Sequence, residues 1–469
     1  RDQPRSRGLG DVYKRQILEG NTFMFLKKIS SVICSVVIAV TSLILPVSSE
    51  MRADEGMRNI STMQLVRDMG IGINLGNTYE SCGDWISQWG NGTVESYETA
   101  WGSPVITKQI IQGYAQEGFG VLRIPVAWSN MMGGDYTINA EYLAAVKEAA
   151  DWALECGLYV ILNIHYDNGW FSGFSTNKSE CMYKYTRIWT QLSEAFRDYG
   201  DYLMFESLNE EGCWDDIWDR NGGSTANKKK AFDLLNEINQ KFVDIVRNSG
   251  GNNAKRHLLI AGYATDFKLT CDSLFKMPED PQGRCAVSVH YYTPSVFAIL
   301  EEDASWGTMR ETWGTEEDFK ELDYYMDLMK KTYIDKGIPV IIGEYGCPKK
   351  NKDEASVRLF LKSVCEAAYS RQMCPVLWDI TGLHYDRSTC KMIDQQLKSD
   401  FMNILESTKL RGDISGNGEI DLYDAIEIAK YIMGMVSFDS EQCEVADYDG
   451  NGTVDLYDAI GVARYIMGI

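Results

Sequence analysis

The chain has 469 residues and a formal net charge of −21, with 67 acidic against 46 basic side chains. Such an acidic chain repels nucleic acid and anionic membrane surfaces, so we expect a neutral polymer, a cation or a protein as its partner. The length predicts two or three domains, one of them large enough for a barrel of about 250 residues or more.

The first 49 residues carry signs of export. Residues 1–23 lack apolar periodicity and precede Met24, so we expect them to be a non-native or upstream segment. Residues 24–49 begin with basic side chains, continue as an apolar run and end in small residues, which is typical of a secretory signal peptide cleaved near Ser49. A membrane anchor is the alternative, but the run is short and contains several Ser and Thr. We therefore expect a secreted, extracellular protein without a membrane span in its mature chain.

The cysteine pattern argues against a zinc site. Of 12 cysteines, one lies in the signal peptide, and the other eleven include no CxxC pair and no Cys/His cluster at metal spacing. An odd number leaves at least one thiol unpaired, and the spacing fixes no disulfide connectivity.

Strand-like and helix-like segments alternate between residues 57 and 405. The runs between the strands, such as 141–155 and 228–247, have the apolar spacing of amphipathic helices. The strand-like runs, rich in β-branched and aromatic residues, are 71–75, 120–126, 158–165, 202–210, 257–262, 285–292, 338–344 and 374–379. Eight β/α units in this span predict an α/β fold, the (β/α)8 TIM barrel, as a catalytic domain over 57–405.

Polar side chains stand at or beside the carboxyl ends of these strands, which share one face of a barrel. Two ends carry carboxylates, Glu210 after the fourth strand and Glu344 after the seventh. Two facing carboxyls can divide acid and nucleophile work, as glycoside hydrolysis requires, although either alone could be a loop cap or an ion-pair partner. Glu206, deeper in the fourth strand, is interpreted as a buried structural carboxylate that needs a partner. The remaining strand-end residues are Arg123, His165, Tyr166, Asn209, His290, Tyr292 and Trp378.

Aromatic residues are frequent in the loops beyond those ends. Sugar rings pack their flat C–H faces on aromatic rings, so these residues predict an aromatic-lined cleft. Alternatively, several of them pack the loops onto the barrel. They are Tyr166, Trp170, Phe171, Trp214, Trp218, Trp306 and Trp313.

Seven segments together resemble glycoside hydrolase family 5, and within it the endoglucanase-rich subfamily 4. In chain order they are GINLGNTYE, GFGVLRIPVAW, GLYVILNIHYD, FESLNEE, SVHYYTP, GIPVIIGEYG and VLWD. The resemblance implies a retaining hydrolase of β-1,4-linked polysaccharides, with Glu210 as acid/base and Glu344 as nucleophile. It implies that the other strand-end residues shape the subsite around the scissile bond.

Two departures from the family pattern lie next to implied site residues, one beside Glu210 and one beside His165. Glu211 stands where the family usually has proline, and Tyr166 where it usually has histidine. Glu211 either raises the pKa of Glu210 by like-charge repulsion or points to solvent without effect. For catalysis we expect Arg123 and a tyrosine to hold the pKa of Glu344 low, and Glu210 to start protonated.

After a short linker at 406–411, the segment 412–434 recurs at 446–468, which is a period of 34 residues. Residues 412–469 carry 12 acidic side chains against Lys430 and Arg464, a density that bound cations would relieve. Oxygen-bearing residues stand at the loop positions of an EF-hand, with glycine at position six, which predicts two Ca²⁺ sites. The predicted ligands are Asp413, Ser415, Asn417, Glu419, Asp421, Asp424, Asp447, Asp449, Asn451, Thr453, Asp455 and Asp458.

This repeat resembles the type I dockerin, a small all-α paired EF-hand-like calcium module that docks a cohesin on a scaffoldin. Ser415 is a poorer ligand than Asp449 at the matching place, so we expect weaker binding at the first site. Ile426, Ala429, Ile432, Ile460, Ala463 and Ile466 are expected to form the core between the helices. The residues that match the cohesin-binding positions of the family are Leu422, Tyr423, Leu456 and Tyr457.

Together these features predict a secreted retaining endo-β-1,4-glucanase that acts on β-glucan and is attached to a cellulosome. Three alternatives stay open. The first is activity on xyloglucan, mixed-linkage glucan or mannan; the second is a catalytically silent glycan-binding barrel; the third is a calcium-regulated sensor. Calcium is the only cofactor expected, and catalysis needs none.

Overall fold

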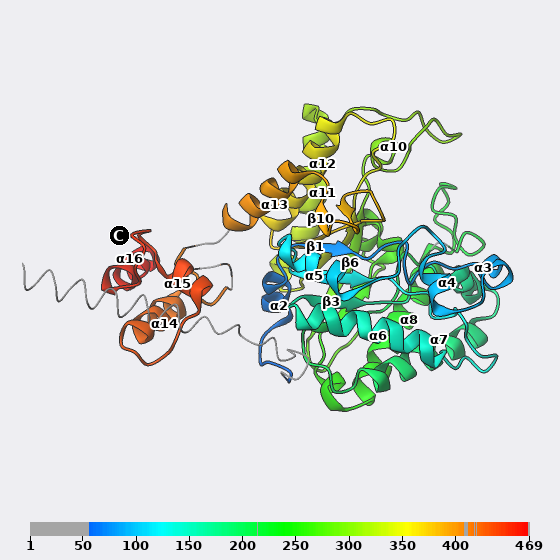
Figure 1. The fold of residues 1–469 in the computed structure, drawn as a ribbon, viewed down its shortest axis with the longest axis horizontal. Helices are drawn as coiled ribbons and strands as arrows, with labels where there is room; N and C mark the ends of the chain where they lie inside the picture. The colour runs from blue at the N-terminus through cyan, green and yellow to red at the C-terminus, as the bar shows by residue number, and fades with distance from the viewer. Residues whose placement is uncertain (1–55, 213, 408–410, 417, 419, 468–469) are drawn as a thin grey trace, which may run out of the picture. The chain divides into compact units, whose positions relative to one another are not determined.

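The computed structural model describes residues 56–212, 214–407, 411–416, 418 and 420–467. The predicted upstream segment at 1–23 and the signal peptide at 24–49 lie outside these residues. Eight parallel strands follow one another around a closed barrel (Figure 1), which β1 completes by pairing with β8. The strands are β1 (Gly72–Asn74), β2 (Val121–Ile124), β3 (Tyr159–Leu162), β4 (Leu203–Glu206), β5 (Leu258–Ala261), β6 (Cys285–Tyr291), β7 (Val340–Tyr345) and β8 (Cys374–Leu377). The predicted (β/α)8 barrel is confirmed.

Helices connect the strands on the outside of the barrel. The long ones are α5 (Lys108–Gln116), α6 (Ala140–Glu155), α7 (Lys178–Ala195), α8 (Lys228–Asn248), α11 (Glu316–Thr332), α12 (Glu354–Tyr369) and α13 (Gln395–Ser407). Shorter helices are α2 (Thr62–Asp68), α3 (Asp84–Trp89), α4 (Val94–Glu98), α9 (Phe267–Thr270) and α10 (Ser295–Ala298). The 3-10 turns are η2 (Asp167–Ser175), η3 (Gly251–Ala254), η4 (Tyr263–Thr265) and η5 (Ile334–Lys336), and β9 (Tyr385–Asp386) pairs with β10 (Lys391–Met392).

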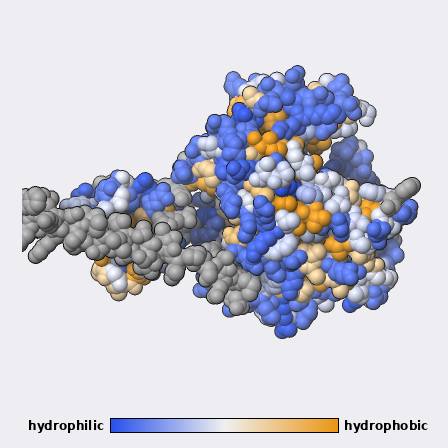
Figure 2. All heavy atoms as spheres, in the orientation of Figure 1, coloured by the Kyte–Doolittle hydropathy of each residue, from blue (hydrophilic) through white to orange (hydrophobic). Residues whose placement is uncertain are grey.

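Local sequence explains where the helices begin and which side they bury. The Asn139 side chain caps α6 by accepting a hydrogen bond from the Tyr142 amide, and Thr315 and Asp318 form a capping box at α11. α8 buries one apolar face against the barrel, and the rest of the helix faces solvent. The visible outer face is accordingly mostly hydrophilic, with separate apolar spots (Figure 2).

All eight strands are shorter than the sequence predicts. β4 ends at Glu206, so Asn209 and Glu210 lie in the loop that follows, although the Ser207 amide still donates to the Leu259 carbonyl of β5. The strand residues are buried, because the apolar runs that predicted them face either the barrel interior or the covering helices. Polar side chains over the barrel mouth therefore come in part from the loops that follow the carboxyl ends of the strands.

The C-terminal module consists of α14 (Leu422–Ile432), α15 (Ser440–Ala446) and α16 (Leu456–Met467). Its own apolar core is formed by Ala425, Ile428, Ala446, Ala459 and Val462. The predicted core is wrong for three residues, since Ile426 is 44% exposed, and Ile460 and Ile466 are exposed as well, whereas Ile432 packs against the core. Ala429, Ile432 and Ala463 are half-buried. The short α15 between the repeats was not predicted.

Two further observations bear on the chain as a whole. Among the described residues, no helix is both long enough and apolar enough to cross a membrane. Ten cysteines lie in the described part of the chain, and none of these ten is joined in a disulfide.

Candidate active site

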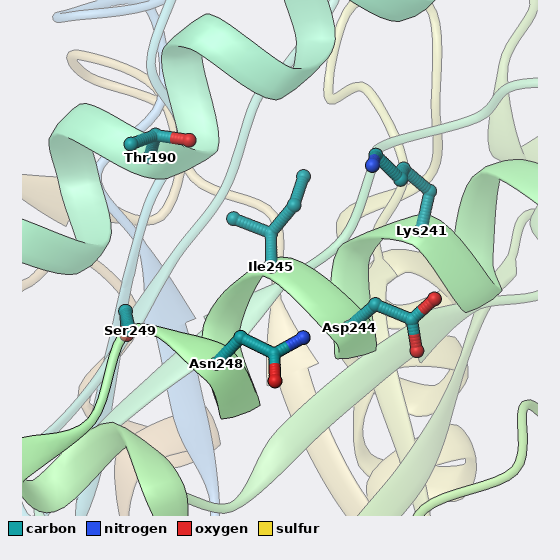
Figure 3. A pocket seen from close by; sticks show the side chains of 6 residues that line it. All are labelled: Thr190, Lys241, Asp244, Ile245, Asn248 and Ser249. Carbon is teal, nitrogen blue, oxygen red and sulfur yellow. The ribbon is translucent and has the colours of Figure 1, made fainter.

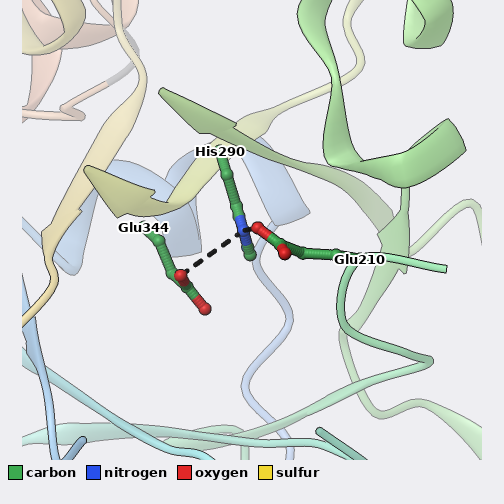
Figure 4. Close-up of side chains that lie close together, drawn as sticks. All are labelled: Glu210, His290 and Glu344. Atoms are coloured by element: carbon green, nitrogen blue, oxygen red, sulfur yellow. Dashed lines mark hydrogen bonds and ion pairs between the residues drawn. The ribbon is translucent and has the colours of Figure 1, made fainter. Parts of the chain in front are cut away.

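The two strand-end carboxylates predicted from the sequence lie together over the barrel mouth (Figure 4). Glu210 comes from the loop after β4, Glu344 from β7, and His290 of β6 lies between them. His290 Nδ1 is 2.8 Å from Glu210 Oε1 and 3.6 Å from Glu344 Oε2. Oxygens of the two carboxylates lie within 4.8 Å of each other, a close approach of the kind that retaining glycosidases need.

A bulge in β7 brings Glu344 to this position. The register between β6 and β7 shifts just before His290, so His290 lies opposite Glu344 and Gly343 is the extra residue. A Cβ atom on Gly343 would lie 3.0 Å from Ser288 Oγ and 3.2 Å from His290 Nε2. A larger residue here would therefore press on Ser288 and His290, which would have to give way by a few tenths of an ångström.

Arg123 of β2 organises the floor of the site. Its guanidinium is fully buried and donates to Glu206 at 2.7 Å, Glu344 at 2.8 Å, Asn74 at 2.9 Å and Asn209 at 3.0 Å. Glu206 is fully buried as expected, and Arg123 is one of its partners. One cation thus fixes the orientation of two carboxylates and two amides.

The pKa of Glu344 differs from the expectation. Burial raises the pKa of Glu344 above its ordinary value, and the charges of His290 and Arg123 offset this only in part. Tyr292 Oη donates to Glu344 Oε2 at 3.0 Å, and burial beside this carboxylate raises the pKa of Tyr292 well above its usual value. The predicted low pKa of Glu344 is wrong for the free protein, because the carboxylate has little contact with water.

Glu210 shows the opposite balance. The loss of water around Glu210 raises its pKa, but the hydrogen bond and the charge of His290 outweigh this effect. The pKa of Glu210 is therefore below its ordinary value. Half of the Glu210 side chain, 50%, remains exposed toward the barrel mouth. A bound ligand that covers this half would remove water and shift the pKa of Glu210 upward.

Besides burial, the like-charge repulsion between Glu210 and Glu211 raises the pKa of Glu211. Burial, followed by the charges of Glu210 and Asp167, raises the pKa of Glu211 to about 8. At neutral pH its carboxyl is therefore largely protonated, and it does not raise the pKa of Glu210 as one of the two sequence interpretations supposed.

The other predicted ligand-binding residues surround the pair. His165 is buried, its ring lies parallel to Trp378 with centroids 5.8 Å apart, and burial holds its pKa well below the usual value. Asn209 is buried beside Arg123, whereas Tyr166 is 56% exposed at the rim. The structure thus brings all nine predicted active-site residues to one face of the barrel.

The predicted aromatic lining is only partly present. Phe171, Trp214, Trp218 and Trp313 are buried and pack their loops onto the barrel, and Trp170 is half-buried. Tyr166 and Trp306 remain exposed, the latter by 58%. Two exposed tryptophans in the connection between β1 and β2, Trp85 on α3 and Trp101, were not predicted.

Sequence reasoning also missed residues that hold the site. Asn74 ends β1 and donates to the Gly343 carbonyl at 2.9 Å while it accepts from Arg123. Asp167 is fully buried and accepts hydrogen bonds from Trp170 Nε1 at 2.7 Å and from the Ser129 amide and hydroxyl at 2.8 Å. Asn74 lies in the segment GINLGNTYE and Asp167 ends the segment GLYVILNIHYD, and this position is the signal that could have identified them.

In the second repeat loop, oxygens of Asp447, Asp449 and Asp458 lie within 4.8 Å of one another. Asp458 is buried and accepts from the backbone amides of Asp449 at 3.1 Å and Asp455 at 2.7 Å. Asp447 accepts from the Gly452 amide at 2.8 Å. Three converging carboxylates on a loop with glycine at position six are a donor set that fits Ca²⁺.

The first loop repeats these contacts. Buried Asp424 accepts from the amides of Ser415 and Asp421, both at 2.8 Å, and Asp413 accepts from the Gly418 amide at 2.7 Å. Ser415 occupies the position of the third carboxylate and donates to Asp413 at 3.1 Å. The predicted ligands Asn417 and Glu419 lie outside the described residues.

The predicted partner-binding residues Leu422 and Tyr423 of α14 and Leu456 and Tyr457 of α16 are all exposed. Ile426 and Ile460 extend these two apolar faces by one helical turn.

A surface hollow between α7 and α8 takes no part in the site. Figure 3 shows the six residues that line it, Thr190, Lys241, Asp244, Ile245, Asn248 and Ser249. They stand on the outer helices, away from the carboxyl ends of the strands.

Comparison with known proteins agrees with this geometry. Residues 85–383 match the family model "Cellulase (glycosyl hydrolase family 5)", and residues 411–467 match "Dockerin type I domain". Endoglucanase B of Clostridium cellulovorans is 30% identical over 401 residues, which cover 81% of this chain and 86% of that protein.

Two solved structures are also similar. A broad-specificity endoglucanase of subfamily 4 from an uncultured bovine rumen ciliate has a TM-score of 0.67 at 35% identity, over 74% of this chain and 99% of its own. A family 5 lichenase from Caldicellulosiruptor sp. F32, in complex with cellotetraose, has a TM-score of 0.68 at 32% identity, over 75% and 97%. The chain therefore belongs to the family 5 glycosyl hydrolases, the cellulases, and carries a C-terminal dockerin type I domain.

Proposed function

We propose that Glu344 is the nucleophile and Glu210 the acid/base of a retaining endo-β-1,4-glucanase. The observation that supports this most is the approach of the two carboxylates to within 4.8 Å, with His290 between them and Arg123 beneath. This separation allows one carboxylate to attack the sugar while the other reaches the leaving oxygen.

In the first step, a Glu344 oxygen bonds to the anomeric carbon as the glycosidic C–O bond breaks, and Glu210 gives its proton to the departing oxygen. In the second step, Glu210 takes a proton from water, the water oxygen bonds to the anomeric carbon, and the Glu344 carboxylate leaves. Glu344 is uncharged while esterified, so the pKa of Glu210 falls when it must act as a base.

In the free protein, the pKa values of Glu344 and Glu210 are shifted in directions opposite to those that the first step needs. Burial raises the pKa of Glu344, and His290 lowers that of Glu210. A sugar bound over the exposed half of Glu210 displaces water there, which favours the proton on Glu210 and leaves Glu344 paired with Arg123. Substrate binding thus prepares the required charge states.

Other residues position the sugar. Asn209 is held by Arg123 and suits a hydrogen bond to the 2-hydroxyl, a contact that strengthens in the transition state. His165, Tyr166, Tyr292 and Trp378 line the subsite around the scissile bond. The exposed Tyr166 and Trp306 rings offer apolar surface to sugar faces.

The substrate is proposed to be a β-1,4-glucan of the plant cell wall. The resemblance to a lichenase favours mixed-linkage glucan as a second candidate. Reducing-sugar release from carboxymethylcellulose, xyloglucan, lichenan and mannan by wild type and Glu344→Gln tests both substrate class and mechanism. We expect cleavage of a glucan and a loss of about a thousandfold or more in the variant. No cleavage of any polymer would instead favour a silent glycan-binding barrel.

Dockerin type I domains bind calcium. We propose two ions here, held by the twelve loop ligands predicted from the sequence, with the first loop the weaker because Ser415 replaces a carboxylate. Isothermal titration of the full chain with Ca²⁺ should resolve two affinities, and Ser415→Asp should bring them closer.

The apolar faces of α14 and α16 are proposed to bind a cohesin of a scaffoldin, after export directed by residues 24–49. The two faces carry the same Leu-Tyr pair, so either can serve. Loss of cohesin binding should require alanine at all four positions, Leu422, Tyr423, Leu456 and Tyr457. Full loss after substitution of one pair would refute this equivalence.

A further inference from the structure

A second buried acid lies below the active-site pair. Glu206 is the last residue of β4 and is fully buried. Its Oε2 accepts from Arg123 Nε at 2.7 Å, and its Oε1 accepts from Ser288 Oγ of β6 at 2.7 Å. It reaches the reacting groups only through Arg123.

Arg123 joins this acid to the proposed nucleophile. The side chains of Arg123 and Glu206 are 0% exposed and that of Glu344 is 7% exposed, so one guanidinium faces two carboxylates in a site with little water. Charges in such surroundings interact far more strongly than in bulk solvent. Whatever part of the positive charge Glu206 balances is not available to stabilise Glu344.

We propose that Glu206 is a positioning residue for the reaction, and that by sharing the charge of Arg123 it keeps Glu344 a strong nucleophile. This inference rests on the proposed role of Glu344. The same negative charge favours the positive charge that develops on the sugar in the transition state. Glu206 itself touches neither substrate nor reacting atoms.

Several other ionisable groups face Glu344. They are Arg123 of β2, His290 of β6, Tyr292 directly after β6, and Glu210 in the loop after β4. The charges of Arg123 and His290 add to burial in lowering the pKa of His165, which follows β3. A substitution at Glu206 leaves all of these in place, so its effect on Glu344 is separable from theirs.

Glu206→Gln removes the charge and keeps the shape. The amide oxygen can accept from Arg123, and the amide nitrogen can donate to Ser288, whose hydroxyl rotates. We expect the acidic limb of the pH profile of kcat/KM, which reports ionisation of Glu344, to move down by about one pH unit. We expect kcat at the plateau to fall by roughly tenfold or more, since a less basic carboxylate attacks more slowly.

Two further variants separate charge from structure. Ser288→Ala removes the other partner of Glu206 without changing a charge, so its acidic limb should stay at the wild-type pH. Glu206→Asp keeps the charge but withdraws it from Arg123, so its limb should move in the same direction by a smaller amount. If Glu206→Gln does not fold, the position of the acidic limb in Glu206→Asp tests the inference.

The full chain is assayed with a soluble aryl β-cellobioside from pH 4 to 9, with folding checked by circular dichroism. The inference is supported if the acidic limb lies at lower pH in the folded Glu206 variants and stays at the wild-type pH in Ser288→Ala. Reduced activity with the limb at the wild-type pH in the folded Glu206 variants means a structural role and overturns it. Glu344→Gln is measured in parallel: if it retains activity, the proposed function fails, whereas an inactive Glu344→Gln with unmoved limbs refutes only the role of Glu206.

Discussion

Asp379, two residues after β8, makes the stability of the barrel depend on pH. It is fully buried, one oxygen accepts from the amides of His384 at 2.8 Å and Tyr385 at 3.1 Å, and the other has no hydrogen-bond partner among the described residues. Burial raises its pKa from 3.8 to about 7. Because the folded state holds this proton more tightly than the unfolded chain, the stability it contributes is complete below about pH 4 and is lost as pH rises to about 7.

The size of the effect follows from this shift. One pKa unit corresponds to about 1.4 kcal/mol, and between pH 5 and the folded-state pKa of about 7 the Asp379 carboxyl stays protonated in the folded protein while it is ionised in the unfolded chain. Asp379 therefore withdraws about 2–3 kcal/mol of unfolding free energy over that interval. Asp379→Asn keeps the oxygen that accepts both amides but does not ionise. We expect the free energy of unfolding of the variant, relative to wild type, to rise by about 2–3 kcal/mol from pH 5 to pH 8.

Urea unfolding followed by tryptophan fluorescence measures this difference, and all 12 tryptophans lie before residue 379, so the signal reports the barrel. Asp280→Asn is the matched control. Its ion pair with Arg247 holds the pKa of Asp280 at about 2 despite burial, so its stability is present above pH 4 and is lost only in acid. The control should be destabilised equally at pH 5 and 8. A constant difference between Asp379→Asn and wild type would refute the reasoning.

Three further predictions concern the site and the calcium module. Tyr292→Phe removes the 3.0 Å hydrogen bond to Glu344 and should lower kcat by roughly tenfold to a hundredfold with an unchanged circular dichroism spectrum, and a rate within twofold of wild type would contradict it. Gly343→Ala places a methyl group 3.0 Å from Ser288 Oγ and should lower kcat by roughly a hundredfold, because the neighbouring site residues are displaced. Michaelis–Menten kinetics measures this, and a kcat equal to that of wild type would contradict it. Chelation of calcium should abolish binding to immobilised cohesin and leave turnover of soluble glucan unchanged, whereas a parallel loss of turnover would favour the calcium-sensor alternative.

Sequence periodicity was sufficient for the barrel because each strand is a short apolar run that ends in polar residues. Glu210 and Glu344 could be found in this way, since parallel strands of one barrel end on the same face. The bulge at Gly343 could not, because it depends on the register between β6 and β7. Its effect, the placement of Glu344 opposite His290, becomes visible only in three dimensions.

The expectations that failed depend on burial. The pKa of Glu344 was expected to be low from its neighbours alone, but its separation from water outweighs Arg123 and His290. In the C-terminal module, Ile426 was assigned to the core because it is apolar, yet Ala425 and Ile428 are the buried core residues of α14. The apolar spacing of α14 fits two faces, and only packing distinguishes the core face from the exposed one.

Identification of the covalent intermediate tests the central proposal most directly. An activated 2-deoxy-2-fluoro-β-cellobioside slows both steps and lets the glycosyl-enzyme accumulate, after which digestion and mass spectrometry locate the sugar. The proposal predicts one 2-deoxy-2-fluorocellobiosyl group on the peptide that contains Glu344, formed by wild type and absent in Glu344→Gln. A sugar attached to another residue, or an active enzyme that accumulates no adduct, would contradict it.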